Sequence, residues 1–69
     1  MNKLYTMPNC PKCEYAKKIL KNAGIEYEEV TDVKKAIEQG YTSAPVFEYE
    51  ASGAYMKYPD IIKAFKGDD

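Results

Sequence analysis

The sequence predicts an α/β domain in which three helices flank one mixed four-stranded sheet, in the order β-α-β-α-β-β-α. Segments rich in β-favouring residues alternate with segments whose apolar residues recur every three or four positions. Prolines and glycines fall between these segments, where regular structure is expected to begin or end. The length of 69 residues leaves room for a single domain, 1–69, with one small core.

The first half predicts a strand–helix–strand unit. Residues 3–6 favour a β-strand, and apolar residues at helical spacing follow from Pro11. Gly24 is expected to end this helix in the left-handed conformation. The next strand is expected at 25–30, and its charged residues indicate a place near a sheet edge. Because a helix connects them, the two strands are expected to run parallel.

A second, shorter helix is expected after this unit. Thr31 or Asp32 is the expected cap, because a short polar side chain there can accept hydrogen bonds from free backbone amides. Gly40 is expected to close the helix. The spacing places three apolar residues on its inner face: Val33, Ala36 and Ile37.

The last third predicts a hairpin and a final helix. Strands are expected at 45–49 and 54–57, joined by a turn over 50–53. Pro59 is expected to begin the helix, because its fixed φ suits a first turn. Three apolar residues of this helix are expected to face inward before Gly67: Ile61, Ile62 and Phe65.

The only segment with evident redox chemistry is Cys10-Pro11-Lys12-Cys13, at the start of the first predicted helix. Pro11 in the first helical position places Cys10 at the N-cap, so its sulfur faces the free amides of Lys12 and Cys13. These amides and the helix dipole favour the thiolate and lower the pKa of Cys10. Cys13, one turn further and more buried, is placed to attack a mixed disulfide on Cys10. This predicts a dithiol that cycles with a disulfide.

Other roles for the two cysteines stay open at this stage. A disulfide across so short a loop would contribute only about 2 kcal/mol by constraining the unfolded chain. A structural zinc site needs four ligands, and the chain has two cysteines and no histidine. Two copies of the chain could supply four thiolates to zinc or an iron–sulfur cluster. The thiols could also be inert.

Composition and charge indicate where in the cell the protein is expected and which classes of partner it is expected to bind. The N-terminus shows no secretory signal and no apolar run long enough to span a bilayer, so a cytoplasmic protein without membrane contact is expected. The net charge of −1 argues against binding nucleic acid. Residues 1–25 carry five lysines against one acid, whereas 26–50 carry seven acids against two lysines. The lysines either solvate a helix face or steer an acidic partner toward the cysteines.

Four segments together resemble the glutaredoxin-like family of the thioredoxin fold, and most of all its NrdH-redoxin branch. They are Tyr5-Thr6, Cys10-Pro11-Lys12-Cys13, Gly40-Tyr41-Thr42-Ser43-Ala44-Pro45-Val46 and Pro59-Asp60-Ile61-Ile62. A CxxC pair beside a βαβ unit already suggests this fold. The resemblance implies a small monomeric dithiol–disulfide oxidoreductase without metal or organic cofactor, in which Cys10 and Cys13 are catalytic.

The resemblance also implies partners and a substrate site. The expected substrate is a disulfide-containing protein, typically ribonucleotide reductase, and the expected reductant is thioredoxin reductase or glutathione. A cis bond before Pro45, beside the cysteines, would let Ala44 offer its backbone to an extended substrate segment. The alternative is that Pro45 merely starts an edge strand. The expected substrate-binding residues are Pro11, Lys12, Ser43, Ala44 and Pro45.

The chain departs from glutaredoxins at several positions. Glutaredoxins often have a cation at Met7, a tyrosine at Lys12 and two glycines near Tyr55 and Met56. Without the glycines, a ligand cannot approach the backbone as closely. These differences weaken the case for a dedicated glutathione site, although a glutathione-dependent glutaredoxin remains the nearest alternative.

Overall fold

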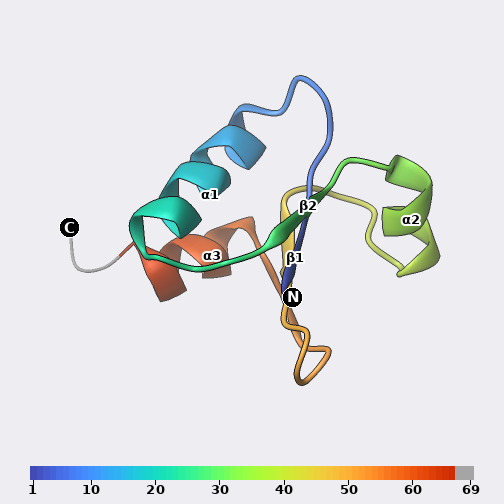
Figure 1. Cartoon of the computed structure of the whole chain (residues 1–69). Helices are drawn as coiled ribbons and strands as arrows, with labels where there is room; N and C mark the ends of the chain where they lie inside the picture. The colour runs from blue at the N-terminus through green and yellow to red at the C-terminus, as the bar shows by residue number, and fades with distance from the viewer. Residues whose placement is uncertain (67–69) are drawn as a thin grey trace.

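The structure of the chain is a computed structural model that describes residues 1–66 (Figure 1). The predicted helix end at Gly67 and the predicted domain end at residue 69 lie outside the described residues. The observed order is the predicted one: β1 (Lys3–Tyr5), α1 (Pro11–Asn22), β2 (Glu28–Val30), α2 (Val33–Glu38), β3 (Val46–Glu48), β4 (Tyr55–Lys57) and α3 (Tyr58–Phe65).

The four strands form one mixed sheet in the order β2-β1-β3-β4. β1 pairs in parallel with β2 and antiparallel with β3, and β4 completes an antiparallel hairpin with β3. β2 lies at an edge, as its charged residues predicted. α1 and α3 pack on one face of the sheet and α2 lies on the other (Figure 1). The predicted thioredoxin-like architecture is confirmed.

The main core lies between the sheet and the α1–α3 pair. Leu4 and Phe47 are opposite each other in the β1–β3 register and point to this face. They meet Ala16 and Leu20 of α1 and Ile61 of α3, and all five side chains are fully buried. Partly buried side chains pack around them, including Phe65, as predicted. The helical spacing of apolar residues in α1 is therefore explained by contact with the sheet.

The opposite face holds a smaller core, and here one prediction is wrong. Tyr5, Val46, Ala36 and Tyr41 are buried together under α2. Of the three residues expected on the inner face of α2, only Ala36 is buried; Val33 and Ile37 are 38% and 59% exposed. α2 spans six residues, and Tyr41 occupies the space beside Ala36, so the helix covers little of this face.

Local signals place the ends of the helices. Asp32 caps α2 by accepting a hydrogen bond from the backbone N–H of Lys34 at 3.0 Å. Gly24 follows the end of α1 with φ +74°, the left-handed conformation that glycine adopts at little cost. α3 begins one residue before Pro59, at Tyr58, so the proline lies second in the helix.

The strands are shorter than predicted. β2 begins at Glu28 rather than at residue 25, because Ile25 continues the turn after α1 with a backbone hydrogen bond to Leu20. β4 begins at Tyr55, one residue later than predicted, although the carbonyl of Ala54 still accepts a backbone hydrogen bond from Tyr49 at 2.8 Å. The N-terminus is tied to this hairpin by an ion pair between the Met1 ammonium and Glu50.

A tyrosine–carboxylate cluster closes the smaller core. The hydroxyl of Tyr41 donates to Glu48 Oε2 at 2.6 Å, and that of Tyr5 donates to Oε1 at 3.5 Å. The two rings meet edge to face, 5.1 Å between centroids. Burial, and then the hydrogen bond to Glu48, raise the pKa of Tyr41 above its ordinary value; burial and Glu48 raise the pKa of Tyr5 in the same direction.

We expect Tyr41→Phe to lower the free energy of unfolding by about 1 to 2 kcal/mol at pH 7, because a hydrogen bond to a charged acceptor is lost. A folded-state pKa raised above the unfolded value of about 10 stabilises the fold below pH 10 and stops doing so as the pH rises further. The difference between wild type and variant should therefore shrink above pH 10. Urea unfolding from pH 7 to 11 measures it, and a constant difference would contradict the assignment.

Candidate active site

Cys10 and Cys13 lie where the sequence predicts, at the leading end of α1. Cys10 is the N-cap residue with extended backbone angles, and Pro11 occupies the first helical turn. The Cα atoms of the two cysteines are 5.2 Å apart, and their sulfurs form a disulfide. The loop of residues 6–10 connects this site directly to the carboxyl end of β1. The pair is therefore placed by a central strand and by a helix.

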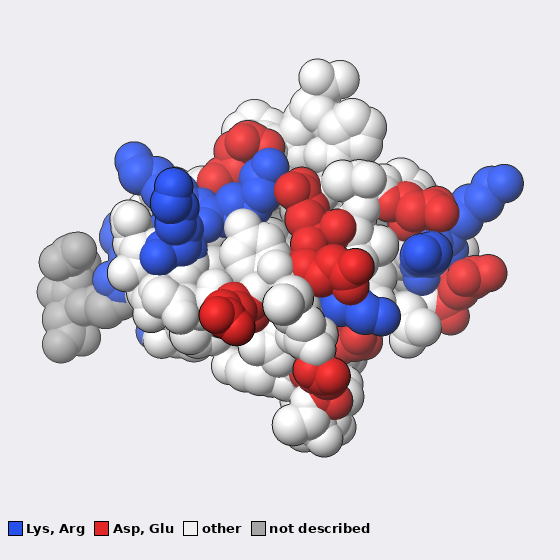
Figure 2. Space-filling view, in the orientation of Figure 1, with Lys and Arg blue, Asp and Glu red and all other residues white. Residues whose placement is uncertain are grey.

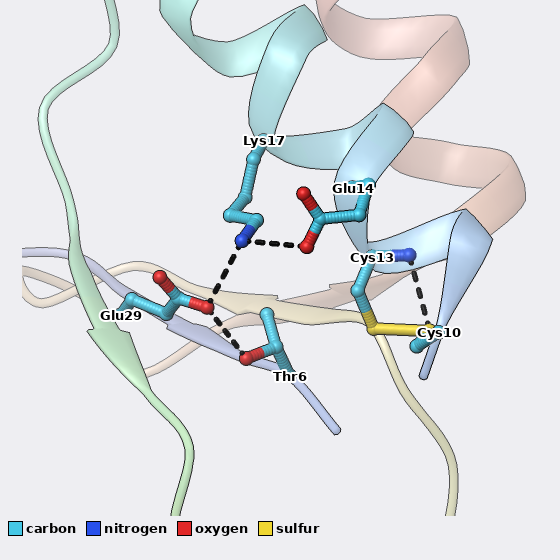
Figure 3. The surroundings of a disulfide bond; sticks show 6 residues. All are labelled: Thr6, Cys10, Cys13, Glu14, Lys17 and Glu29. Carbon is cyan, nitrogen blue, oxygen red and sulfur yellow. Dashed lines mark hydrogen bonds and ion pairs between the residues drawn. A yellow bond between two sulfur atoms is a disulfide. The ribbon is translucent and has the colours of Figure 1, made fainter. Parts of the chain in front are cut away.

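The sulfur of Cys10 is held by the backbone of the helix. It accepts a hydrogen bond from the N–H of Cys13 at 3.1 Å, so one of the two amides expected to face it does so (Figure 3). Cys10 is partly exposed rather than fully exposed, whereas Cys13 is 1% exposed. When the disulfide is reduced, the same amide and the helix dipole favour a thiolate on Cys10.

A cluster of four polar side chains lies beside the disulfide and was not predicted from the sequence (Figure 3). Thr6, which is buried, donates to the Glu29 carboxylate at 2.9 Å, and Lys17 lies 3.3 Å from the same carboxylate and 2.8 Å from that of Glu14. The hydrogen bond to Glu14, with that to Glu29, raises the pKa of Lys17 despite partial desolvation, so its ammonium stays charged. These contacts join the end of β1, strand β2 and helix α1.

Part of this polar cluster could have been predicted from the sequence. Glu14 and Lys17 are three residues apart on one helix, which is ion-pair spacing. Glu29 and Thr6 could be brought together only by the parallel register of β1 and β2, in which Leu4 is opposite Glu29. That register is a tertiary property.

Lys12, between the two cysteines, contacts the start of α3. Its Nζ lies 5.5 Å from the ring centroid of Tyr58, within the range of a cation–π contact. Lys12 and Pro11 are both exposed. No role for Tyr58 was predicted from the sequence, because a tyrosine usually belongs to the core and nothing local links it to Lys12.

The segment before β3 reaches the same end of the sheet. Val46 is opposite Tyr5 in the antiparallel register, so Pro45 lies beside the residue that continues β1 toward Cys10. The Ala44–Pro45 bond is cis, as the resemblance implied. Ser43 is exposed, Ala44 partly exposed and Pro45 buried. β3 is an internal strand, so Pro45 does not start an edge strand.

Charge is unevenly spread around the site. In Figure 2 one group of lysines lies over α1, at the left, and acidic side chains gather over β2, in the centre. Lys18 and Lys21 are exposed, while Lys17 is partly buried and paired with two carboxylates. Lys18 and Lys21 lie toward the carboxyl end of α1, whereas Cys10 is at its amino end. The positive charge is therefore a property of the outer face of α1 relative to the strand beside it (Figure 2).

The described part of the chain shows neither a metal-binding cluster nor a membrane-spanning helix. Residues 1–66 contain no group of three or more histidine, cysteine, aspartate or glutamate side chains that could hold a metal ion. Within the same residues, no helix combines the length and the apolar character needed to cross a bilayer.

A mixed β2-β1-β3-β4 sheet with a linked CxxC pair at the head of α1 defines a thiol–disulfide oxidoreductase of the thioredoxin-like fold. The family model for glutaredoxin matches residues 2–46, from β1 to the first residue of β3. The chain belongs to the glutaredoxin family. A comparison with curated proteins gives no match. Membership implies a disulfide substrate and an external reductant in general terms.

The position of Cys10 predicts a pKa below the ordinary value of about 8.5 for a thiol, because its thiolate is stabilised at the N-cap. In the Cys13→Ser variant only Cys10 remains, so the rate of alkylation by iodoacetamide against pH reports this pKa alone. A midpoint below pH 8 is expected. A midpoint at or above about 8.5 would mean that the helix end does not activate the sulfur.

Proposed function

We propose that the protein is a dithiol electron carrier that reduces disulfides in other proteins. The observation that carries this proposal is the Cys10 sulfur at the N-cap of α1, within hydrogen-bonding distance of the Cys13 amide and linked to the Cys13 sulfur. A thiolate at that position is a nucleophile that a substrate disulfide can reach, because Cys10 is partly exposed.

The exchange proceeds in two steps. The Cys10 thiolate attacks one sulfur of the substrate disulfide, forms a mixed disulfide and releases the other substrate sulfur as a thiolate, which takes up a proton. Cys13, after losing its proton, attacks the Cys10 sulfur and releases the second substrate thiol. The substrate gains two electrons and two protons, and the Cys10–Cys13 disulfide is formed.

Burial supports this division of roles. Cys13 is 1% exposed and cannot meet a protein disulfide directly, whereas it lies within reach of the Cys10 sulfur. The disulfide is then reset by thioredoxin reductase or by glutathione, which supplies the two electrons. Neither the exchange nor the reset requires a metal or organic cofactor bound to this chain.

We propose that the substrate backbone binds along residues 43–45 and that Pro11 and Lys12 also contact the substrate. Residues 43–45 lie at the amino end of β3, beside the strand that leads to Cys10. An extended segment placed against Ala44 would add a short strand next to the site and bring its disulfide to Cys10.

A place in the NrdH-redoxin branch, with ribonucleotide reductase as substrate, is part of this proposal. It is supported by the resemblance of Ser43-Ala44-Pro45-Val46 and Pro59-Asp60. The side chains found in place of glycines weaken the case for a glutathione-dependent enzyme, although the NrdH branch also tends to have a glycine near Met56. The Tyr55 ring packs against Tyr41 with centroids 5.1 Å apart, and Met56 packs against the main core. Unlike glycine, each of these residues carries a side chain, which limits how closely a small ligand can approach the backbone there.

The reductant distinguishes the two candidates. In NADPH-coupled assays, thioredoxin reductase is expected to support reduction of a protein disulfide about tenfold faster than glutathione with its reductase, because Met7, Tyr55 and Met56 stand where glutaredoxins often have a cation and glycines. The two assays are run side by side on the same substrate and protein concentration. Faster turnover with glutathione would assign the chain to the glutathione-dependent group.

A further inference from the structure

Two aromatic rings and two ammonium groups form a row on the surface beside Cys10. Lys12 Nζ lies 5.5 Å from the centroid of the Tyr58 ring, Tyr58 and Tyr15 have centroids 6.5 Å apart, and Lys66 Nζ lies 5.9 Å from the centroid of Tyr15. We call these four residues the tyrosine–lysine row. It runs across α1 and α3 and begins between the two cysteines.

The contact between Lys12 and Tyr58 leaves the Lys12 ammonium able to bind a carboxylate of the substrate beside Cys10. Within residues 1–66, no carboxylate forms an ion pair with Lys12. A ring face attracts an ammonium without accepting its three N–H donors as a carboxylate would. Tyr58 therefore limits where the Lys12 ammonium can lie and leaves its hydrogen-bonding capacity unused. Lys17, by contrast, is already bound to Glu14 and Glu29.

The two helices carry a net positive charge. α1, α3 and Lys66 together hold six lysines against two acids, in a chain whose net charge is −1. The two acids are Glu14, which is paired with Lys17, and Asp60, in the first turn of α3; other acidic side chains gather over β2 (Figure 2). The rings of the row are accessible as well: Tyr15 is 36% exposed and Tyr58 is partly exposed. A surface of this composition suits a ligand with carboxylates and some apolar area.

We propose that the tyrosine–lysine row selects substrates in which acidic residues flank the disulfide. This inference rests on the proposed function, because it names the substrate class of the same site. With the substrate sulfur at Cys10, an extended segment advances about 3.3 Å per residue, so a glutamate two or three positions away reaches Lys12. Tyr58 and Tyr15 are specificity-determining residues: they position the ammonium groups and cover the aliphatic part of the segment.

Three synthetic peptides of equal length test this proposal. Each holds one disulfide, and they differ only in the flanking residues, which are glutamate, glutamine or lysine. At low ionic strength, the reduced protein should reduce the glutamate peptide about fivefold faster, in kcat/KM, than the lysine peptide, with the glutamine peptide between them. In 0.5 M NaCl the three rates should converge, because the charges are screened.

Variants test whether the preference for acidic peptides depends on the tyrosine–lysine row or only on the net charge of the protein. Lys12→Gln should remove most of the preference, and Tyr58→Leu should reduce it about twofold, while Tyr58→Phe, which keeps the ring, should retain it. Lys34→Gln on α2 is the matched control with the same loss of charge, and it should retain the full preference.

The outcomes separate this inference from the function on which it rests. Equal rates for all three peptides in the wild type, or an undiminished preference in Lys12→Gln, would overturn the role of the row while leaving the oxidoreductase intact. An undiminished preference in Tyr58→Leu would remove Tyr58 from the specificity determinants. Failure to reduce any of the three peptides would count against the proposed function itself.

Discussion

Cys10→Ser is expected to lower disulfide reduction to the rate measured without protein. A serine hydroxyl is not ionised near neutral pH and cannot form a disulfide with the substrate, so the first step of the exchange is lost. Cys13, at 1% exposure, cannot replace it as the attacking group. The measurement is reduction of a protein disulfide such as insulin, supplied with a reductant that regenerates the wild-type protein.

Cys13→Ser tests the second step and serves as the matched variant. The Cys10 thiolate still attacks, but no second thiol resolves the mixed disulfide, so a covalent complex should accumulate. Intact mass under non-reducing conditions should show the mass of protein plus substrate, and a reducing agent should remove it. Robust dithiol turnover by Cys10→Ser, or no complex with Cys13→Ser, would rule out this assignment of roles.

Phe47→Ala is expected to have the largest effect on stability. Phe47 is fully buried in β3 and contacts Tyr49 and Phe65 edge to face, with centroids 5.1 and 5.5 Å apart. Truncating such a ring costs about 3 to 5 kcal/mol through lost burial and the cavity left behind. A core of this size rarely supplies more than about 3 to 5 kcal/mol of stability. Most molecules of the variant should therefore be unfolded at 25 °C.

Urea unfolding followed by circular dichroism measures this loss. Phe47→Leu, which keeps most of the buried area, should fold and lose less free energy, so the effect remains measurable if the alanine variant does not fold. Ile37→Ala is the control on the α2 side, where the side chain is 59% exposed, and should change stability by less than about 0.5 kcal/mol. A folded Phe47→Ala protein of nearly wild-type stability would contradict the description of the core.

The order of elements and the ends of the helices could be predicted because their signals are local. Pro11 and Gly24 mark the beginning and end of α1 through their own backbone preferences. Asp32 marks the beginning of α2 through the hydrogen bond that its side chain accepts. Each signal depends only on nearby residues, so a single sequence contains it.

The inner face of α2 could not be predicted, because it depends on what lies opposite. Helical spacing groups Val33, Ala36 and Ile37, yet burial requires a partner surface. Tyr41 packs beside Ala36 and directs its hydroxyl to Glu48, which leaves Val33 and Ile37 largely in solvent. The sequence shows a helix here but not how much of it the sheet can cover.

The same distinction applies to the site. Cys10 and Cys13 are three residues apart at the start of one helix, so their proximity follows from the sequence alone. The neighbours that complete the site come from other elements, and only the packing of α1 against α3 brings Tyr58 to Lys12. The sequence therefore predicts that the two sulfurs lie together, but not that Tyr58, Thr6 and Glu29 lie near them.

The central claim is that the reactive sulfur is that of Cys10, activated by the end of α1, while the sulfur of Cys13 is held back by burial. The most direct test treats the fully reduced wild-type protein with less than one equivalent of iodoacetamide at pH 7 and maps the labelled peptide. The structure predicts that Cys10 carries at least about ten times more label than Cys13. Equal labelling, or labelling of Cys13 first, would contradict it.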